Sequence, residues 1–387
     1  MLRFRTIAAL AGLIPAFALY GGAASGPAPT AARSPASASR PVHLQPAAKV
    51  SRPAFRLAVR QHYGPAANAS GYSVLLVTGP RRAWAFGGTN PGGPSAPVAV
   101  RSDGRSVTQS TLPSGLTGFI SDASAPGASD IWAASRFGGY VLHFDGQHWQ
   151  VARKWRRGEI TGLIATSARD VWAFGKTLAG PRGIGTWHFD GKSWSRVSGL
   201  ADSVYRASAV SGRDYWAIGT SQDAQFLLRY NGTTWRRLHA VHALAGVQLC
   251  DILAISDRNV WVAGDQVSRS GVVSVVLAHW TGTHWTRLDS RLHAWAGRLA
   301  PGPHGGVLLT ATPAGASATG LILEASSRGW RGTLIVRAGL GSGISDVALA
   351  PRTRSLWAAG GILTRLGGDA AIWSGPFGRP SRHQDTI

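Results

Sequence analysis

The chain has 387 residues and carries 40 Lys+Arg against 18 Asp+Glu, which gives a formal net charge of +22 at pH 7. A single Cys excludes an intramolecular disulfide framework and any metal site built from cysteine thiolates. Sixteen Trp among 44% hydrophobic residues exclude a fully disordered chain, and 50 Gly with only two Glu disfavour a helical one, because Gly is a poor helix former. The composition favours an all-β protein with a strong positive field.

The N-terminal segment has the layout of a secretory signal peptide. Two arginines precede an apolar stretch over residues 7–20, and small residues that suit cleavage follow. The alternative, an uncleaved anchor, needs a longer apolar run, and Pro15 interrupts this one. We therefore expect a leader over residues 1–24 and a secreted protein, with cell-wall association as an option. Residues 25–53 are rich in Ala, Pro and Ser, which predicts a disordered linker.

One sequence unit repeats along the rest of the chain. Two of its clearest copies read ARDVWAFG…GTWHFDGKSWSRV and DRNVWVAG…LAHWTGTHWTRL. The first Trp of the unit recurs at Trp84, Trp132, Trp172, Trp216, Trp261 and Trp357. The intervals are 40 to 48 residues, and a final interval of 96 contains a degenerate unit around Leu308. Seven such units predict a seven-bladed β-propeller over residues 54–376, followed by a tail over residues 377–387.

Each unit is expected to form four short strands. In one unit these strands cover residues 160–166, 171–175, 186–189 and 193–197. The Asp190–Gly191 pair between the last two predicts a tight hairpin, because a type I′ turn needs positive φ at both central residues. The large Trp rings are expected to pack between neighbouring blades.

The two ends of the repeat predict how the ring closes. The last unit lacks a good fourth strand, whereas an orphan strand over residues 54–60 precedes the first unit. We expect this N-terminal strand to complete the last blade, because closure of the ring removes exposed sheet edges.

Tandem units of the form D-V-W-A-x-G … H-x-D-G-x-x-W resemble the secreted β-propeller repeat proteins of actinobacteria and related bacteria, which often carry only a repeat or kelch-like label. Gly87–Gly88 and Gly360–Gly361 fit the glycine doublet of kelch repeats, while the middle units do not. The resemblance implies the fold but no single activity, because propellers host many functions. One member type, the dispase autolysis-inducing protein, is a secreted seven-bladed propeller, and likeness to it implies protease modulation.

Three acidic residues fall on predicted innermost strands, which line the central channel of a propeller. They are Asp122, Asp251 and Asp346, and Arg206 occupies the matching position of another unit. Carboxylates at this place can hold a cation or contact a ligand. The alternative is a hydrated or arginine-paired channel wall. All four are candidate ligand-binding residues, and we expect no metal site and no cofactor.

The other acids and several histidines repeat from unit to unit, which indicates structural roles. One acidic set precedes the second strand and another occupies the hairpin turns, and we expect both to accept local backbone hydrogen bonds. The first set is Asp130, Asp170 and Asp214, and the second is Asp103, Asp145 and Asp190. A repeated third-strand position holds His143, His188 and His279, which we expect to point outward. Cys250 lies among apolar residues and predicts a buried, inert thiol.

The densest basic cluster reads VARKWRRGE and contains Arg153, Trp155, Arg156 and Arg157. Arginine beside an exposed Trp binds polyanions through charge and stacking, so these four are also candidate ligand-binding residues. The alternative is that the arginines reflect composition and keep an exported protein soluble.

The sequence favours a secreted, non-catalytic binding or scaffold propeller whose partner is an extracellular protein or an anionic polymer of the cell envelope. We assign no catalytic residue, expect no membrane span after leader cleavage, and expect a monomer. One alternative is an extracellular glycan hydrolase or lyase with carboxylates at the channel mouth, which would require two acids close together. A protease-modulating protein is the other alternative.

Overall fold

The computed structural model describes residues 55–63, 69–90, 95–156, 158–176, 184–197, 203–221, 224–239, 241–315, 319–353, 355–365 and 367–377. The expected leader, the expected linker and almost all of the expected tail lie outside these residues, so those assignments stay predictions. Strands dominate the described residues, whose helical elements are the short 3₁₀ turns η2 (His242–Leu244) and η3 (Pro303–Gly305).

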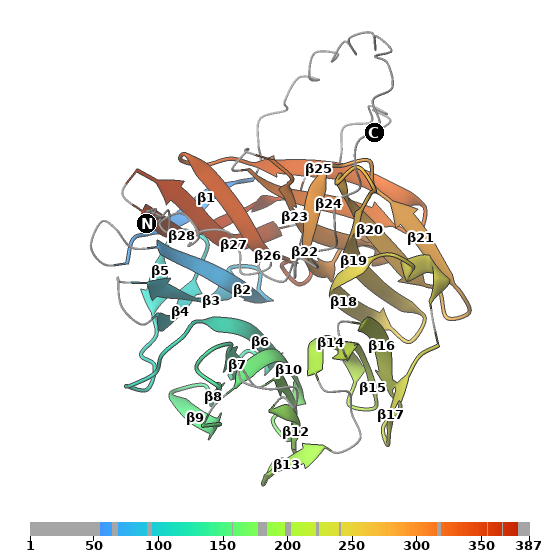
Figure 1. Ribbon diagram of the computed structural model, residues 1–387. Helices are drawn as coiled ribbons and strands as arrows, with labels where there is room; N and C mark the ends of the chain where they lie inside the picture. The colour runs from blue at the N-terminus through green and yellow to red at the C-terminus, as the bar shows by residue number, and fades with distance from the viewer. Residues whose placement is uncertain are drawn as a thin grey trace, which may run out of the picture.

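Seven antiparallel sheets of four strands each follow one another around a ring (Figure 1). Blades 1 to 6 run from the innermost strand outward in chain order. Blade 1 contains β2 (Ala69–Gly79), β3 (Arg82–Asn90), β4 (Ala96–Ser102) and β5 (Val107–Gln109). Blade 2 contains β6 (Ile120–Gly127), β7 (Asp130–Ser135), β8 (Tyr140–Phe144) and β9 (Trp149–Lys154). Blade 3 contains β10 (Glu159–Ser167), β11 (Asp170–Lys176), β12 (Gly185–Phe189) and β13 (Trp194–Val197).

The second half of the ring repeats this arrangement. Blade 4 contains β14 (Ser203–Ser211), β15 (Asp214–Ser221), β16 (Ala224–Tyr230) and β17 (Trp235–Arg237). Blade 5 contains β18 (Gln248–Ser256), β19 (Asn259–Val267), β20 (Val273–Trp280) and β21 (Trp285–Asp289). Blade 6 contains β22 (Ala294–Pro301), β23 (Val307–Pro313), β24 (Gly320–Ser326) and β25 (Gly329–Val336). Blade 7 contains β26 (Gly341–Leu349), β27 (Ser355–Thr364), β28 (Gly367–Pro376) and β1 (Arg56–Gln61). The predicted seven-bladed propeller is confirmed.

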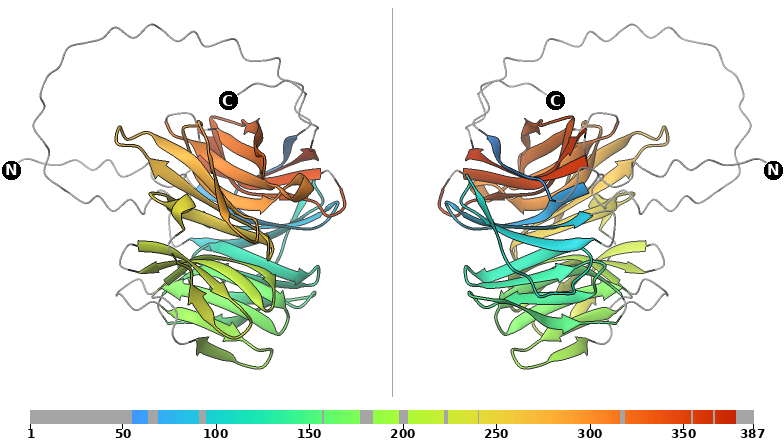
Figure 2. Two further views of the ribbon diagram at one scale, coloured as in Figure 1. Left: turned by 90° about the vertical axis from the view of Figure 1, so that its right-hand side faces the viewer. Right: turned by 90° about the vertical axis from the view of Figure 1, so that its left-hand side faces the viewer.

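The N-terminal strand closes the ring, as the sequence predicts. β1 pairs antiparallel with β28, and both side views show this first strand beside the last blade (Figure 2). Phe55 and Val59 are buried there. Asp369 of β28 accepts a hydrogen bond from Arg60, and its Oδ1 lies 2.7 Å from His62 Nδ1. Burial acts to raise the pKa of Asp369, but these two partners outweigh it and lower the pKa.

Aromatic rings fill the space between blades. The second-strand Trp of one blade contacts the fourth-strand Trp of the next, with ring centroids 5.7 Å apart for Trp84 and Trp149 and 5.6 Å apart for Trp172 and Trp235. The second-strand rings are nearly inaccessible, and Trp132 is 2% exposed. A ring of this size buries about 150–250 Å², so these contacts dominate the cohesion between sheets.

The repeated acid at the start of the second strand is structural, as predicted, but it binds side chains and not the local backbone. Asp130 accepts a hydrogen bond from Trp132 Nε1 at 2.9 Å, and its Oδ1 also lies 2.9 Å from His143 Nε2. The His143 ring stacks on Trp132 with a centroid distance of 4.1 Å, so this histidine does not simply face outward. The same three-part contact recurs in blades 3 and 5, with Asp170, Trp172 and His188 in one and Asn259, Trp261 and His279 in the other.

The fourth blade changes this contact. The hairpins form where the sequence predicts them, but they are not type I′ turns, because at Asp190–Gly191 only the glycine has a positive φ, of 94°. Asp214 of blade 4 pairs with Arg229 at 2.9 Å instead of a histidine. The hairpin acids do accept backbone hydrogen bonds: Asp190, for example, accepts the N–H groups of Lys192 and Ser193, each at 2.8 Å. The acids of the turns are therefore committed to local structure.

Removal of β1 tests the closure of the ring. A chain that begins at Ala69 loses Phe55 and Val59 and leaves β28 as an exposed edge. We expect it to be at least about 3 kcal/mol less stable than a chain that begins at Pro53, because burial of one large apolar side chain contributes about 1.5–3 kcal/mol. Chemical denaturation of both chains measures the difference, and equal midpoints would show that the ring does not need β1.

Candidate functional site

The sequence-predicted acids do meet in the central channel, where they join neighbouring blades. Each innermost strand has a free edge, so N–H groups on that edge have no strand to pair with. Asp122 Oδ2 accepts the N–H of Leu163 in the next blade at 2.9 Å. Asp251 does the same for Leu299 at 2.7 Å, and Asp346 does so for Leu75 at 2.8 Å. These carboxylates therefore satisfy backbone donors across three blade interfaces.

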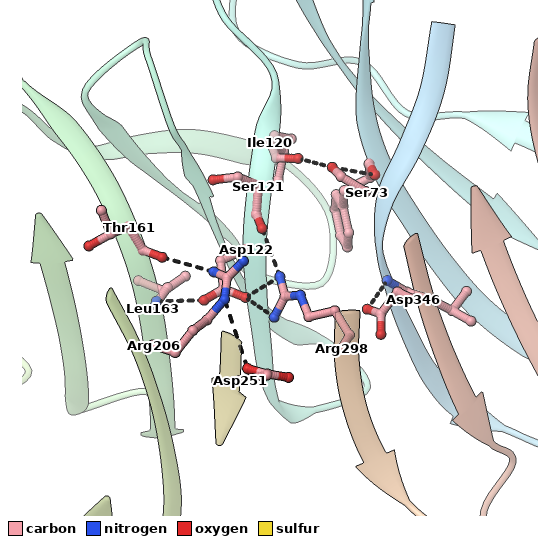
Figure 3. Close-up of polar contacts among 12 residues, drawn as sticks. Ser73, Ile120, Ser121, Asp122, Thr161, Leu163, Arg206, Asp251, Arg298 and Asp346 are labelled. Atoms are coloured by element: carbon pink, nitrogen blue, oxygen red, sulfur yellow. Dashed lines mark hydrogen bonds and ion pairs between the residues drawn. The ribbon is translucent and has the colours of Figure 1, made fainter. Parts of the chain in front are cut away.

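Two arginines lie in the channel beside these carboxylates, and Arg298 reaches across it from blade 6 to blade 2 (Figure 3). Arg298 of blade 6 donates to Asp122 Oδ1 of blade 2 at 3.1 and 3.2 Å and to the Ser121 carbonyl at 2.8 Å. Arg206 of blade 4 donates to the Thr161 carbonyl at 2.9 Å, and its Nε lies 3.8 Å from Asp251 Oδ1. Asp122 and Asp251 therefore have arginine partners in the described residues, and ligand binding by the four channel residues stays a prediction.

Sequence reasoning singled out Arg206 but missed Arg298. Arg298 occupies the matching position of the innermost strand in blade 6, the degenerate unit in which Leu308 stands where other units have Trp. Alignment of that unit on its strands would have found it. Among the described residues, no group of three or more His, Cys, Asp or Glu side chains forms a metal site.

Burial in the channel shifts the pKa of the ionisable groups. It raises the pKa of Asp251 against the opposing effects of Arg298 and Arg206. Burial also raises the pKa of Asp346 to about 6, although the charge of Arg298 acts to lower it. The hydrogen bonds that this carboxylate accepts in the described residues come from backbone N–H groups and not from an arginine. For Arg298 burial acts to lower the pKa, but the carboxylates, first Asp122 and then Asp346, outweigh it and raise the pKa.

The second predicted group lies apart from the channel, on the outermost strand of blade 2 and the link that follows. The Arg153 guanidinium lies over the rings of Trp187 at 4.8 Å and Trp155 at 5.8 Å. Trp155 also contacts Trp187 at 5.7 Å, so its ring belongs to the packing between blades 2 and 3. Arg156 is exposed, and Arg157 lies outside the described residues. Ligand binding by this group stays a prediction.

The two faces of the ring differ in chemistry. On one face, here called the loop face, the innermost strands begin, and the links between blades and the loops between second and third strands lie there. On the opposite turn face lie the tight turns that join the first to the second and the third to the fourth strands. The loop face holds the exposed side chains of Phe137, Val267, Val272, Trp295 and Leu340. The other exposed large apolar side chains of the described residues, Leu57, Val151 and Ile335, lie on outermost strands.

Arginines accompany the apolar side chains of the loop face. Exposed Arg269 follows Val267, which is 54% exposed. Exposed Arg291 precedes Trp295, which is 46% exposed, and exposed Arg337 precedes Leu340. The loop face can therefore offer apolar contacts and positive charge together.

A pocket of about 530 Å³ opens between blades 4 and 5, beside the three-residue outermost strand β17. Trp216, Trp280 and Trp285 line it, together with Arg229. The Arg229 guanidinium lies 4.7 Å from the Trp216 ring and is paired with Asp214. The lining groups belong to the contact between the two blades, so the pocket is a gap in that packing.

Comparison with known proteins identifies the fold. No protein-family model matches this sequence, and no curated protein matches it. A structure described as YCF48 bound to D1 peptide is similar, with a TM-score of 0.55, 14% identity, and coverage of 85% of this chain and 99% of that one. A catalytically inactive virginiamycin B lyase from Staphylococcus aureus with quinupristin has a TM-score of 0.50, 11% identity, and coverage of 82% and 99%. At these identities the likeness shows the propeller fold alone. No helix in the described part of the chain is long and apolar enough to span a membrane.

Replacement of Arg298 tests the channel network. Arg298→Met leaves Asp122 buried without its cation, which costs about 3–5 kcal/mol when one partner of a buried pair is removed. Asp122→Asn in the same chain should restore much of the loss, because the amide oxygen still accepts the Leu163 N–H. Urea denaturation of both variants measures the effect. A single variant as stable as the wild type would contradict the proposed pairing.

The raised pKa of Asp346 predicts a pH dependence. A carboxyl that keeps its proton to higher pH in the folded state loses stabilisation as the pH rises from about 4 to 6. Asp346→Asn should therefore gain about 2 kcal/mol relative to the wild type between pH 4.5 and pH 7.5. Denaturation of both proteins at the two pH values measures this gain, and a constant difference would refute it.

Proposed function

We propose that this protein is a secreted, non-catalytic propeller that binds a segment of another extracellular protein on its loop face. The observation that carries the proposal is the grouping of exposed apolar side chains on that one face, where Trp295 and Leu340 are 46% and 60% exposed. Isolated exposed apolar residues are normal, but a set confined to one face marks an interaction surface. The leader-like N-terminal sequence supports the secreted location.

The positive charge of the loop face indicates which kind of peptide segment can bind there. Arg269, Arg291 and Arg337 are exposed beside the apolar side chains. Complementary charge fixes the register of a complex and rejects partners of like charge. The proposed ligand is therefore an extended segment in which Asp or Glu residues flank apolar ones. The similar propeller YCF48 was solved with a D1 peptide, which supports a peptide segment as the kind of ligand.

The contacts of the channel acids favour binding over glycan chemistry. The carboxylates of Asp122, Asp251 and Asp346 each accept a backbone N–H, and Asp122 and Asp251 face arginines. In this arrangement the carboxylates hold neighbouring blades together. A glycosidase instead needs a pair of carboxyl groups that flank the glycosidic bond of its substrate. The resemblance to the dispase autolysis-inducing protein makes a protease one partner to examine.

Selection from a random peptide library on the immobilised protein tests the proposal. Enriched peptides should carry apolar residues next to Asp or Glu. Trp295→Ala and Leu340→Ala should each weaken binding of an enriched peptide at least about tenfold, because aromatic and apolar anchors dominate interfaces. Val151→Ala, which removes a 40% exposed apolar side chain from the middle of the outermost strand of blade 2, is the matched control.

Two outcomes would contradict the proposal. One is a library without any enriched sequence pattern. The other is an equal loss of affinity in the Val151→Ala control and in the loop-face variants, since binding would then not be centred on the loop face.

A further inference from the structure

The turn face carries a repeated arginine that none of the roles described above uses. In blades 3, 4 and 5 the turn between the first and second strands holds Arg169, Arg213 and Arg258, and all three are exposed. These three residues, here called the arginine arc, occupy the same repeat position, one residue before the second strand. Because the blades are consecutive, the arc spans three neighbouring blades of the turn face.

The structure builds the arc in the same way three times. A serine two residues earlier accepts the arginine backbone N–H in each turn, as Ser167 does for Arg169 at 3.2 Å. Each arginine stem lies against the glycine of the adjacent hairpin turn: a Cβ placed on Gly191 would come within 2.6 Å of Arg169 Cγ. Gly232 and Gly282 stand in the same relation to Arg213 and Arg258. The backbone and the lower part of each side chain are therefore fixed, and the guanidinium groups remain at the surface.

The charges of the arc have little compensation. Among the described residues, no carboxylate lies within ion-pair distance of Arg169 or Arg213, and Arg258 has only a 3.9 Å contact with exposed Asp257. Further exposed cations lie in other turns of this face, at Arg81, Arg82, Arg105, Lys192, Arg328 and Arg352. The hairpin acids, such as Asp190, accept backbone N–H groups and keep their negative charge, but the exposed cations of the turns outnumber them. The turn face is thus a strongly basic surface.

The turns of this face expose few rings on which a base could stack, and in the described residues these are His148, His284 and His304. In the described residues, no exposed large apolar side chain lies in its turns. Proteins that bind single-stranded nucleic acid add aromatic platforms on which the bases stack. A surface with fixed guanidinium groups and no exposed Trp, Tyr or Phe in its described turns suits a polymer that offers repeated anionic groups and a flexible, ring-free backbone. Guanidinium groups bind phosphate oxygens through paired hydrogen bonds.

We propose that the arginine arc docks a linear polyol-phosphate polymer through its phosphodiester groups. This site is separate from the peptide surface of the loop face, so the molecule can hold a polymer on one face and a protein segment on the other. The contacts are electrostatic and exchange counterions, so affinity falls steeply with salt.

The test measures binding of fluorescently labelled poly(glycerol phosphate) by anisotropy over a range of salt concentrations. The variant Arg169→Glu/Arg213→Glu/Arg258→Glu should bind at least about tenfold more weakly, and its logarithmic salt slope should fall by about two, at roughly 0.7 per lost phosphate contact. The control Arg269→Glu/Arg291→Glu/Arg337→Glu makes the same change in net charge on the loop face and should keep the slope. Arg169→Gln/Arg213→Gln/Arg258→Gln gives a milder variant if charge reversal perturbs folding.

Several results would overturn the proposal. Equal losses in the arc variant and the loop-face control would show that net charge alone governs binding. Tighter binding of an oligothymidylate of matched charge would indicate nucleic acid, and tighter binding of heparin would indicate an acidic glycan. Absence of binding by the wild type at physiological salt would remove the site. Peptide binding on the loop face is measured separately, so either proposal can fail without the other.

Discussion

The indole ring buried between neighbouring blades is the contact on which the rest of this molecule depends. A four-stranded sheet has two faces, and a single sheet cannot cover both with its own side chains. The rings of Trp132 and Trp172 cover one face of their blade, because each packs against the fourth-strand Trp of the next blade. The Asp or Asn before that strand and the stacked His then hold the ring in one orientation. The last blade needs the same cover, which is why β1 joins β28.

In the channel, side chains satisfy the backbone N–H groups at the free edges of the innermost strands. Seven innermost strands turn one edge toward a common axis, and their N–H groups need acceptors. Asp122, Asp251 and Asp346 supply acceptors across three interfaces, and Arg298 and Arg206 supply the opposite charge. Acids that a sequence offers as ligand groups are thus used to join blades. The side chains that are free to contact other molecules therefore lie on the two outer faces of the ring.

The direction of the chain determines which face can vary. The tight turns use Asp–Gly or a similar pair, so few of their positions can vary. The position before the second strand holds arginine in blades 1, 3, 4 and 5. Loops and links on the opposite face have no such requirement and accommodate Phe137, Trp295 and Leu340. The apolar and the polycationic surfaces therefore lie on opposite sides of one rigid ring.

The sequence alone determined the fold, because the Trp spacing and the Asp–Gly or Asn–Gly turns are local signals that recur in most blades. It also placed Asp122, Asp251, Asp346 and Arg206 at the channel, since their distance from the next Trp fixes the strand on which they lie. Only the tertiary structure decided what these residues contact. Arg298 reaches Asp122 across 176 residues of sequence, and the His143 contact with Asp130 depends on strand register. The grouping of exposed apolar side chains on one face likewise follows from how the ring closes, because burial is a property of the assembled blades and not of any one unit.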